Sequence, residues 1–364
     1  MSEPSGLKRL AAPTAPPFAI PTWLRPVQVP AGAHRIAGGW ASFDHLDIIQ
    51  RDDTGYSVSR VTPEGLLSVS DNRNPALAAL DRLTAPRDPW AGLAGDRPAL
   101  MGILNVTPDS FSDGGRHNAP ARAIAAGRAM IEAGADIVDI GGESTRPGAD
   151  PVSRNQELAR VLPPLAGLRD AGAALSIDTR HAEVMTRATA GGADIINDVN
   201  GLRGEGAMEA AVASGAAVVI MHMQGTPETM QKDPTYGFAP VEIYEFLEQR
   251  IEAAEAAGIT RDRIVIDPGF GFGKSVAHNI ALIAWASMFH GLGVQVLIGV
   301  SRKSTIASLS QGETADHRLP GSLGLAMAAV AQGCQVLRVH DVAETAQALA
   351  IQMAMARADR PLTA

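Results

Sequence analysis

Beyond residue 98, eight short apolar runs recur at fairly regular spacing, and each stops at a side chain that can do chemistry. Met101–Leu104 stops at Asn105, for example, and Ala217–Met221 stops at His222. Strands of a parallel sheet are buried on both faces and read as continuous apolar runs, whereas the helices between them are amphipathic. Eight such β-then-α units in about 260 residues have the usual size of a (β/α)8 TIM barrel.

A doubly wound sheet is the structural alternative, but it normally has fewer strands and binds its ligand at one switch point. Polar groups end nearly all eight runs here, so the prediction is an α/β chain, a (β/α)8 TIM barrel with an N-terminal extension. The predicted strands are 99–106, 136–141, 174–178, 194–199, 217–222, 264–267, 294–300 and 336–340. The predicted helices are 119–133, 153–170, 181–190, 206–214, 239–257, 278–289, 320–332 and 343–357.

The region before the barrel divides into two parts by composition. Residues 1–30 hold seven prolines and little periodicity, which predicts a flexible tail. Residues 31–95 form an appended region of uncertain structure. Phe43–Arg51 and Tyr56–Val69 alternate as one or two strands would, and Pro75–Leu83 suits a short helix. The region is either a separate unit or a strap over the barrel, which then occupies residues 96–364.

Composition excludes several classes of protein. A net charge of -8 argues against a nucleic-acid binder, which needs a basic stripe. No run approaches the ~18 apolar residues of a membrane span. Prolines interrupt Met1–Ile20, so no signal peptide is predicted, and the single Cys334 cannot form a disulfide within the chain. These features indicate a cytoplasmic protein without membrane or nucleic-acid partners.

Carboxylates and amides end three of the predicted strands, at Asp178, at Asn197 with Asp198, and at Asp267. Such groups are costly to desolvate in a barrel mouth unless a ligand donates to them. With few cationic neighbours expected, they suit a neutral, flat ring rich in hydrogen-bond donors. A metal site including His222 is the alternative, although the ligands lack tight spacing. Asp198 has its own alternative, an outward-pointing helix cap.

The loops after the first two strands combine glycine with polar groups. In Leu104–Gly115, Asn105 and an aspartate could hold a divalent ion, or the aspartates and serines could simply cap the next helix. In Gly142–Gly148, Arg146 suits bidentate contact with a phosphate, or else a surface salt bridge.

The segment Asp267–Ser275 resembles a phosphate loop, but Pro268 occupies the position where the phosphate-loop motif requires glycine. We reject that reading and keep Phe272 as an aromatic wall for a planar substrate. Loops after strands 7 and 8 commonly bind phosphate in TIM barrels. Here Lys303 follows strand 7, and strand 8 carries Arg338 and His340. A structural ion pair is the alternative for Arg338.

In this order and on these strands, the motifs resemble those of dihydropteroate synthase, a pterin-binding barrel enzyme of folate synthesis. The resemblance runs from about Ala99 to Leu349. It rests on Leu104–Gly115, Gly142–Gly148, Ser176–Thr179, Ile195–Val199, Met221–Met230, Asp267–Lys274, Ser301–Ser304 and Arg338–Val342. Two departures stand out, because residues 1–95 have no counterpart in short members and Arg180-His181-Ala182 replaces an expected Lys-Pro type of segment.

The resemblance implies a magnesium-assisted transferase that joins 6-hydroxymethyl-7,8-dihydropterin diphosphate to p-aminobenzoate, with release of pyrophosphate. It also implies a homodimer and a sulfonamide target. The implied pterin contacts are Asp178, Asn197, Val199, Met221, Asp267, Gly299 and Lys303. The implied p-aminobenzoate contacts are Thr145, Pro147, Phe272, Lys303 and Ser304. The implied diphosphate contacts are Asn105, Arg146, Arg338 and His340, with Asn105 also at magnesium. The implied catalytic residues are Asp267, Lys303, Arg338 and His340.

Two other functions remain as alternatives. A pterin-barrel methyltetrahydrofolate methyltransferase would share the aspartate and asparagine contacts but not need the anion-binding groups after strands 7 and 8. The other alternative is a catalytically silent relative that binds pterins, or that scaffolds another enzyme through residues 1–95.

Overall fold

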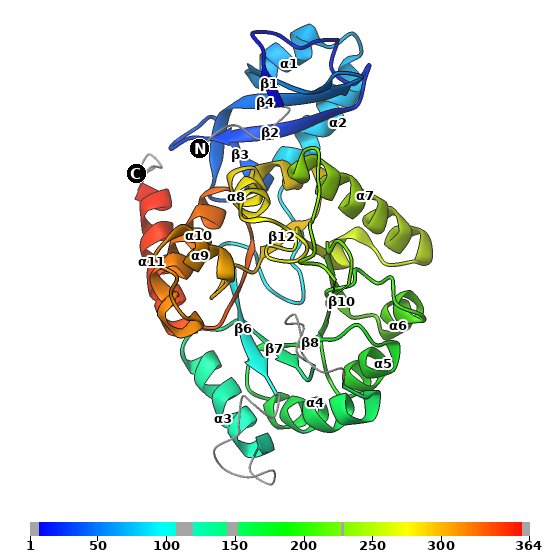
Figure 1. Cartoon of the computed structure of the whole chain (residues 1–364), viewed down its shortest axis with the longest axis vertical. Helices are drawn as coiled ribbons and strands as arrows, with labels where there is room; N and C mark the ends of the chain where they lie inside the picture. The colour runs from blue at the N-terminus through cyan, green and yellow to red at the C-terminus, as the bar shows by residue number, and fades with distance from the viewer. Residues whose placement is uncertain (1–6, 107–118, 144–151, 227–228, 359–364) are drawn as a thin grey trace.

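The computed structural model describes residues 7–106, 119–143, 152–226 and 229–358. Eight parallel strands, each paired with the next along the chain, close into a barrel (Figure 1). This confirms the predicted (β/α)8 fold. The strands are β6 (Ala99–Asn105), β7 (Ile137–Gly141), β8 (Ala174–Asp178), β9 (Ile195–Asp198), β10 (Ala217–Met221), β11 (Ile264–Asp267), β12 (Gln295–Ile298) and β13 (Val336–Val339).

One main helix follows each strand, and the predicted boundaries of seven of the eight agree within two residues with those observed. The helices are α3 (Ala119–Glu132), α4 (Arg154–Leu168), α5 (Ala182–Ala190), α6 (Ala207–Ser214), α7 (Ala239–Ala257), α8 (Val276–Ala284), α10 (Leu319–Ala331) and α11 (Val342–Ala358). Helix α7 ends at Ala257, and its C-cap Gly258 has a φ of 107°, a left-handed conformation that favours glycine. A short additional helix, α9 (Ser304–Leu309), was not predicted.

The predicted helix 278–289 is wrong in its second half. It ends at Ala284, and a 3-10 helix, η5 (Ala286–Leu292), continues the chain. Ser287 in η5 donates a hydrogen bond to the carbonyl of Pro26, 2.7 Å away in the N-terminal region. The change from α-helix to 3-10 helix therefore coincides with a contact to the N-terminal region. The spacing of apolar residues along the helix could not have predicted that contact.

The N-terminal region forms a sheet with the strand order β1-β5-β4-β2, and β3 also pairs with β4. Helices α1 (Pro63–Val69) and α2 (Arg73–Thr84) follow, so the predicted helix 75–83 is confirmed. The strands are β1 (Leu7–Arg9), β2 (Thr22–Gln28), β3 (His34–Arg35), β4 (Ser42–Asp52) and β5 (Gly55–Val61).

The predicted flexible tail is wrong for residues 7–30, because β2 pairs with β4 from Thr22 to Gln28. Pro26 is tolerated because β2 is an edge strand, where a missing N–H leaves no broken ladder. The expected strand character of Tyr56–Val69 also ends early, at Val61. Pro63 begins α1 there, and the Thr62 hydroxyl caps that helix.

The N-terminal sheet lies against one side of the barrel (Figure 1). Both guanidinium ends of Arg51 bind the carboxylate of Glu245 on α7, at 3.0 and 2.9 Å. The indole of Trp40 donates to the carbonyl of Val330 on α10, at 2.8 Å. The guanidinium of Arg25 lies 4.3 Å from the ring centroid of Trp285. The region is therefore docked on the barrel rather than loosely tethered.

The chain between this sheet and β6 closes the bottom of the barrel. Trp90 is 1% exposed and packs inside the barrel against Met101 and Val265. Its indole donates to the carbonyl of Arg263, just before β11 starts, at 3.1 Å. Trp90 therefore seals the amino-terminal end, opposite the rim where the strands finish. Among the described residues, no helix is long and apolar enough to cross a membrane.

Candidate active site

Strand register brings the predicted polar residues into one layer at the carboxyl rim of the barrel. Asn105 pairs with Gly141, Gly141 with Asp178, and Asp178 with Asn197 along four neighbouring strands. On the far side, Met221 pairs with Asp267. Because parallel strands of a barrel end together, these side chains share one mouth.

A buried carboxylate that the sequence reasoning missed, Asp139 on β7, connects several of them. Asp139 is 0% exposed. It accepts hydrogen bonds from the Ser176 hydroxyl at 2.6 Å, the Asn197 side-chain amide at 3.1 Å and Nε of Arg338 at 2.6 Å. A charged residue inside an otherwise apolar run was the available signal, because such a residue must be paired.

Arg338 joins Asp139 to the predicted pterin contact Asp178. A terminal guanidinium nitrogen of Arg338 lies 2.7 Å from Oδ2 of Asp178. The expectation that the rim carboxylates have few cationic neighbours is therefore wrong here, and the ion-pair alternative for Arg338 is what the structure shows. Burial raises the pKa of Asp178 to about 7, because it outweighs the opposing charge of Arg338.

Asp267 lies at the end of β11 and is also buried. Its Oδ1 accepts the backbone N–H of Gly269 at 2.7 Å. Burial raises the pKa of Asp267, and the Gly269 hydrogen bond and the charges of Lys303 and Lys274 oppose that rise. The Lys303 ammonium lies 4.1 Å from the Phe272 ring centroid, a cation–π distance. Asp267, Lys303 and Phe272 therefore belong to one side of the mouth.

Apolar side chains line the space beside Phe272. Val199 and Met221 are buried in a small cluster with Met223 and Met230, and Phe272 packs against that cluster. Gly299 lies next to Arg338, because a β-carbon added at Gly299 would stand 3.7 Å from Cβ of Arg338. Val199 and Met221 are therefore apolar walls on the Phe272 side of the rim, and Gly299 adjoins Arg338.

His340, an implied diphosphate contact, lies beside Ser301. Its Nδ1 lies 3.0 Å from the Ser301 hydroxyl, which also accepts the His340 backbone N–H at 3.2 Å. A hydroxyl can donate and accept, so the ring tautomer decides which group donates in the contact between Nδ1 and Ser301. Burial, aided by the charges of Arg338 and Arg302, lowers the pKa of His340 to about 3. His340 is a neutral hydrogen-bonding group in this structure.

Several alternatives from the sequence are now decided. The Asp198 carboxylate accepts the backbone N–H groups of Asn200 at 2.7 Å and Leu202 at 2.8 Å, so it stabilises a loop. The His222 ring bonds to Lys274, as 2.9 Å separates Nδ1 and Nζ, which removes it from a metal set with Asp178 and Asp267. Lys274 is 3% exposed and therefore cannot act as a phosphate-loop lysine.

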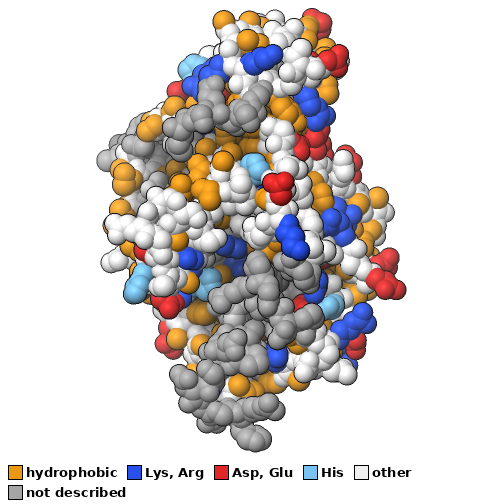
Figure 2. All heavy atoms as spheres, viewed as in Figure 1, with side chains coloured by type: hydrophobic (Ala, Val, Ile, Leu, Met, Phe, Trp, Pro, Cys, Tyr) orange, Lys and Arg blue, Asp and Glu red, His pale blue; other side chains and the backbone are white. Residues whose placement is uncertain are grey.

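Thr145, Arg146 and Pro147 lie outside the described residues, as does the part of Leu104–Gly115 beyond residue 106. Ser304 is the first residue of α9 and follows Lys303 directly. Figure 2 shows Lys, Arg and His side chains near the middle of this face of the barrel.

Comparison with known proteins matches residues 101–340 to the family described as pterin binding enzyme. The dihydropteroate synthase of Escherichia coli K12 is 46% identical over 255 residues, which cover 70% of this chain and 90% of that protein. That of Neisseria meningitidis serogroup B is 48% identical over 266 residues, or 71% and 93% of the two chains. The chain belongs to the dihydropteroate synthase family.

Solved synthase structures agree with this membership. The Xanthomonas albilineans enzyme with 4-aminobenzoic acid superposes with a TM-score of 0.69 at 48% identity, covering 72% of this chain and 96% of that one. The Yersinia pestis enzyme with a sulfonamide drug also gives 0.69, at 46% identity and 72% and 95% coverage. As a synthase-family member the chain is a transferase with a pterin-binding TIM barrel.

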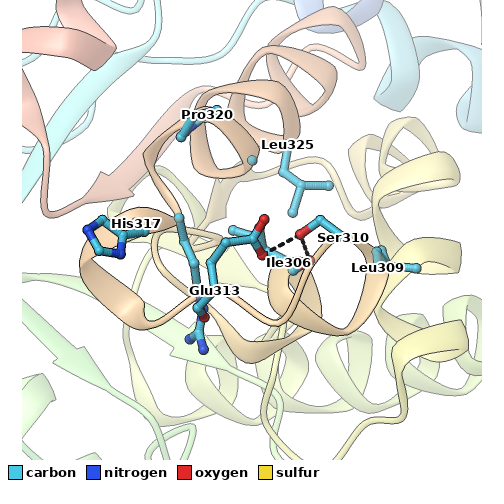
Figure 3. A pocket seen from close by; sticks show the side chains of 9 residues that line it. Ile306, Leu309, Ser310, Glu313, His317, Pro320 and Leu325 are labelled. Atoms are coloured by element: carbon cyan, nitrogen blue, oxygen red, sulfur yellow. Dashed lines mark hydrogen bonds between the residues drawn. The ribbon is translucent and has the colours of Figure 1, made fainter.

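A separate pocket lies behind the synthase rim, between α9 and α10 (Figure 3). Arg318, one of its lining residues, donates to the carbonyl of Arg302 at 2.9 Å and so touches the loop that carries Lys303. The pocket measures about 270 Å³ and contains none of the predicted substrate contacts. Its lining residues are Ile306, Leu309, Ser310, Glu313, His317, Arg318, Pro320, Gly321 and Leu325.

Proposed function

We propose that this chain joins 6-hydroxymethyl-7,8-dihydropterin diphosphate to p-aminobenzoate, giving 7,8-dihydropteroate and pyrophosphate. The observation that carries the proposal is the shared rim, where Asp178, Asn197 and Asp267 adjoin Lys303 and Arg338. The synthase structure from Xanthomonas albilineans in complex with 7,8-dihydropteroate supports the product.

The pterin edge is assigned to the atoms that the internal network leaves available. The side-chain amide of Asn197 donates an N–H to Asp139, so its carbonyl oxygen can accept a hydrogen bond from a ring N–H. Oδ2 of Asp178 accepts a hydrogen bond from Arg338, and we assign Oδ1 to the pterin ring. Asp267 likewise has Oδ2 available beside its bond to Gly269. These three acceptors complement a guanidine-like ring edge, with Lys303 reaching the ring from the side.

The p-aminobenzoate pocket is assigned to Phe272, Lys303 and Ser304, together with Thr145 and Pro147. The Phe272 ring offers a flat surface for the benzoate, and the neighbouring ammonium offers a partner for negative charge. Lys303 therefore borders both substrates. Such a position suits a residue that aligns the amine with the carbon that it attacks.

The diphosphate is assigned to Asn105, Arg146, Arg338 and His340, with a magnesium ion at Asn105. Gly141 has no side chain to cover the neighbouring Asn105 oxygen, which would hold the ion. A β-carbon there would stand 3.7 Å from Oδ1 of Asn105. Oxygen ligands of this kind suit Mg²⁺, which keeps several waters and binds substrate phosphates. When bound, magnesium stabilises negative charge that develops on the leaving group.

A cluster of two glutamates and a histidine elsewhere on the barrel is less suitable for the magnesium ion than Asn105. Glu143, Glu157 and His181 each offer a ligand atom within 4.8 Å of the others. However, Arg180 binds both oxygens of Glu143 at 3.2 Å, and His181 lies 2.7 Å from Glu157. These carboxylates therefore already have basic partners, so we place magnesium at Asn105.

The reaction is proposed to be a dissociative substitution. An aryl amine is a weak nucleophile, so departure of the diphosphate must be assisted by Arg338 and His340. The pterin ring spreads the positive charge from its methylene carbon, and the Asp267 carboxylate stabilises that charge. No covalent enzyme intermediate forms, and a trapped pterin–protein adduct on the reaction path would contradict this.

A pyrophosphate-release assay tests the proposal. Pyrophosphate should appear rapidly when both substrates and magnesium are present, and much more slowly without p-aminobenzoate. Release of a methyl group from methyltetrahydrofolate, or pterin binding without turnover, would instead support the alternative functions. We also propose a homodimer located in the cytoplasm; sedimentation velocity giving a monomer at micromolar concentration would contradict the dimer.

A further inference from the structure

The loop after β11 resembles a phosphate loop in sequence but folds its lysine inward. Gly269, Gly271 and Gly273 have φ values of 72°, 83° and 62°, which favour glycine. A β-carbon on Gly269 would lie 1.9 Å from the His222 carbonyl oxygen, and one on Gly273 would lie 2.6 Å from that of Gln224. The glycines therefore let the loop press directly on the backbone that follows β10.

This close packing encloses the ammonium of Lys274. Its Nζ lies 2.8 Å from the carbonyl oxygen of Phe272, 2.9 Å from Nδ1 of His222 and 3.5 Å from the carbonyl oxygen of His222. Three acceptors around three N–H bonds are the environment of a protonated lysine. His222 must then be neutral, and its pKa is lowered to about 2 by burial and by the charge of Lys274.

No carboxylate among the described residues lies within ion-pair distance of Lys274. Burial lowers its pKa to about 7, the charge of Asp267 opposes that change, and Lys303 adds to it. His278, on α8, and Arg203, which lies near His222, are the other basic groups on neighbouring segments. A buried ammonium without a direct counter-ion is costly, so its retention at this place calls for a reason.

Asp267 supplies that reason. Its carboxylate is buried and must be ionised to stabilise a cationic pterin carbon. Lys274 lies close to it, because the N–H of Gly269 donates to Asp267 at 2.7 Å and a β-carbon on Gly269 would stand 3.3 Å from Nζ of Lys274. Lys303 and Arg338 are the other cations near Asp267. Arg338 is held by Asp139 and Asp178, and Lys303 borders the substrates. Lys274 is the one of the three that is almost fully covered by protein, so a bound substrate does not touch it.

We propose that Lys274 is a positioning residue of the synthase site: its enclosed ammonium keeps Asp267 ionised and secures the loop that carries Phe272. The role in turnover rests on the proposed function, whereas the effect on Asp267 exists in the protein alone. Lys274 touches no substrate and acts through Asp267 and Phe272.

Replacement of Lys274 by methionine removes the charge while keeping a similar volume. The matched control is Tyr236→Phe, which removes a hydroxyl that donates to the Gly273 carbonyl at 2.8 Å. That control loosens the same loop without changing its charge. Circular dichroism would establish folding, and Lys274→Gln would replace Lys274→Met should the latter not fold.

The decisive readout is the carboxyl ¹³C resonance of Asp267, assigned by its loss in Asp267→Asn and followed from pH 3 to 7 in the protein without substrates. We expect the Asp267 midpoint to rise by about one pH unit or more in Lys274→Met and to stay in place in Tyr236→Phe. An unchanged midpoint in Lys274→Met, or an equal rise in both variants, would overturn the proposal.

Pyrophosphate release then separates this inference from the proposed function. With the wild-type chain active, Lys274→Met should lower kcat/KM at least tenfold at pH 6 and move the acidic limb of its pH profile upward. Failure of the wild-type chain to release pyrophosphate would refute the proposed function. The ¹³C titration would still test whether Lys274 keeps Asp267 ionised.

Discussion

Nε of Arg338 lies 2.6 Å from Oδ2 of Asp139, and this bond joins two strands that are 199 residues apart in the chain. Asp139 also accepts from Asn197, so one buried carboxylate orients both an assigned diphosphate contact and an assigned pterin contact. A change at Asp139 should therefore affect the binding of both the pterin end and the diphosphate end of the same substrate.

Substitution of Asp139 by asparagine should lower both stability and activity, because it leaves Arg338 partly uncompensated. Breaking a buried ion pair typically costs about 3–5 kcal/mol. Urea unfolding and the KM for the pterin diphosphate would measure the two effects. The matched control, Ser176→Ala, removes one hydrogen bond to the same carboxylate and should cost about 1 kcal/mol. Equal effects of the two variants would contradict the central role of Asp139.

Substitution of Lys303 by alanine should cost about 2–4 kcal/mol of transition-state stabilisation, as for loss of one preorganised electrostatic donor. Steady-state kinetics of pyrophosphate release would show this as a fall in kcat/KM. Lys8→Ala, at an exposed lysine on β1 of the N-terminal sheet, serves as the control and should behave like wild type. Wild-type-like turnover in Lys303→Ala would refute the assigned role.

Sulfonamides should compete with p-aminobenzoate, because they mimic its shape and the Yersinia pestis synthase has been solved with such a drug. The apparent KM for p-aminobenzoate should rise linearly with sulfonamide concentration, while kcat stays constant. An unchanged apparent KM, with only kcat reduced, would show that the drug acts elsewhere than at the pocket of Phe272 and Lys303.

Stability should depend on pH through Lys274. Its pKa is about 7 in the folded chain and 10.5 ordinarily, so the unfolded chain binds a proton more readily between these values. The contribution of Lys274 to the free energy of unfolding is therefore fully present above pH 10.5 and lost as the pH falls through 7. Urea unfolding of wild type should show a rise between pH 7 and 10 that Lys274→Met lacks. Parallel curves would contradict the shifted pKa.

Substitution of Trp90 by alanine should destabilise the whole barrel by about 3–5 kcal/mol, because it empties the sealed amino-terminal end. Denaturant unfolding would measure this loss. Trp90→Phe keeps most of the apolar volume but loses the hydrogen bond to Arg263, so it should cost clearly less. A mild effect of both would show that the segment before β6 merely lies beside the barrel.

The barrel was predictable because its signal is local. Each buried strand reads as one apolar run, and each run ends at a polar group, so Asn105, Asp178 and Asp267 could be placed at one rim. The N-terminal sheet was not predictable in the same way. The pairing of Thr22–Gln28 with β4 is long-range, and its prolines indicated a tail.

Within the site, the residue types were predictable, but their protonation states and ion-pair partners were not. Burial makes His340 neutral, and Arg338 is bound to two carboxylates, one of which, Asp139, lies inside a strand. Both facts depend on which side chains the barrel brings together across many residues. The inward turn of Lys274 likewise depends on the contact of Gly269 with the backbone of His222.

The most direct measurement is a product balance with the purified chain, both substrates and magnesium, in which 7,8-dihydropteroate and pyrophosphate are quantified together. The account predicts one dihydropteroate for each pyrophosphate, with both products sharply reduced in Asp267→Asn. Pyrophosphate without dihydropteroate, or neither product from a folded wild-type chain that binds the pterin, would contradict it.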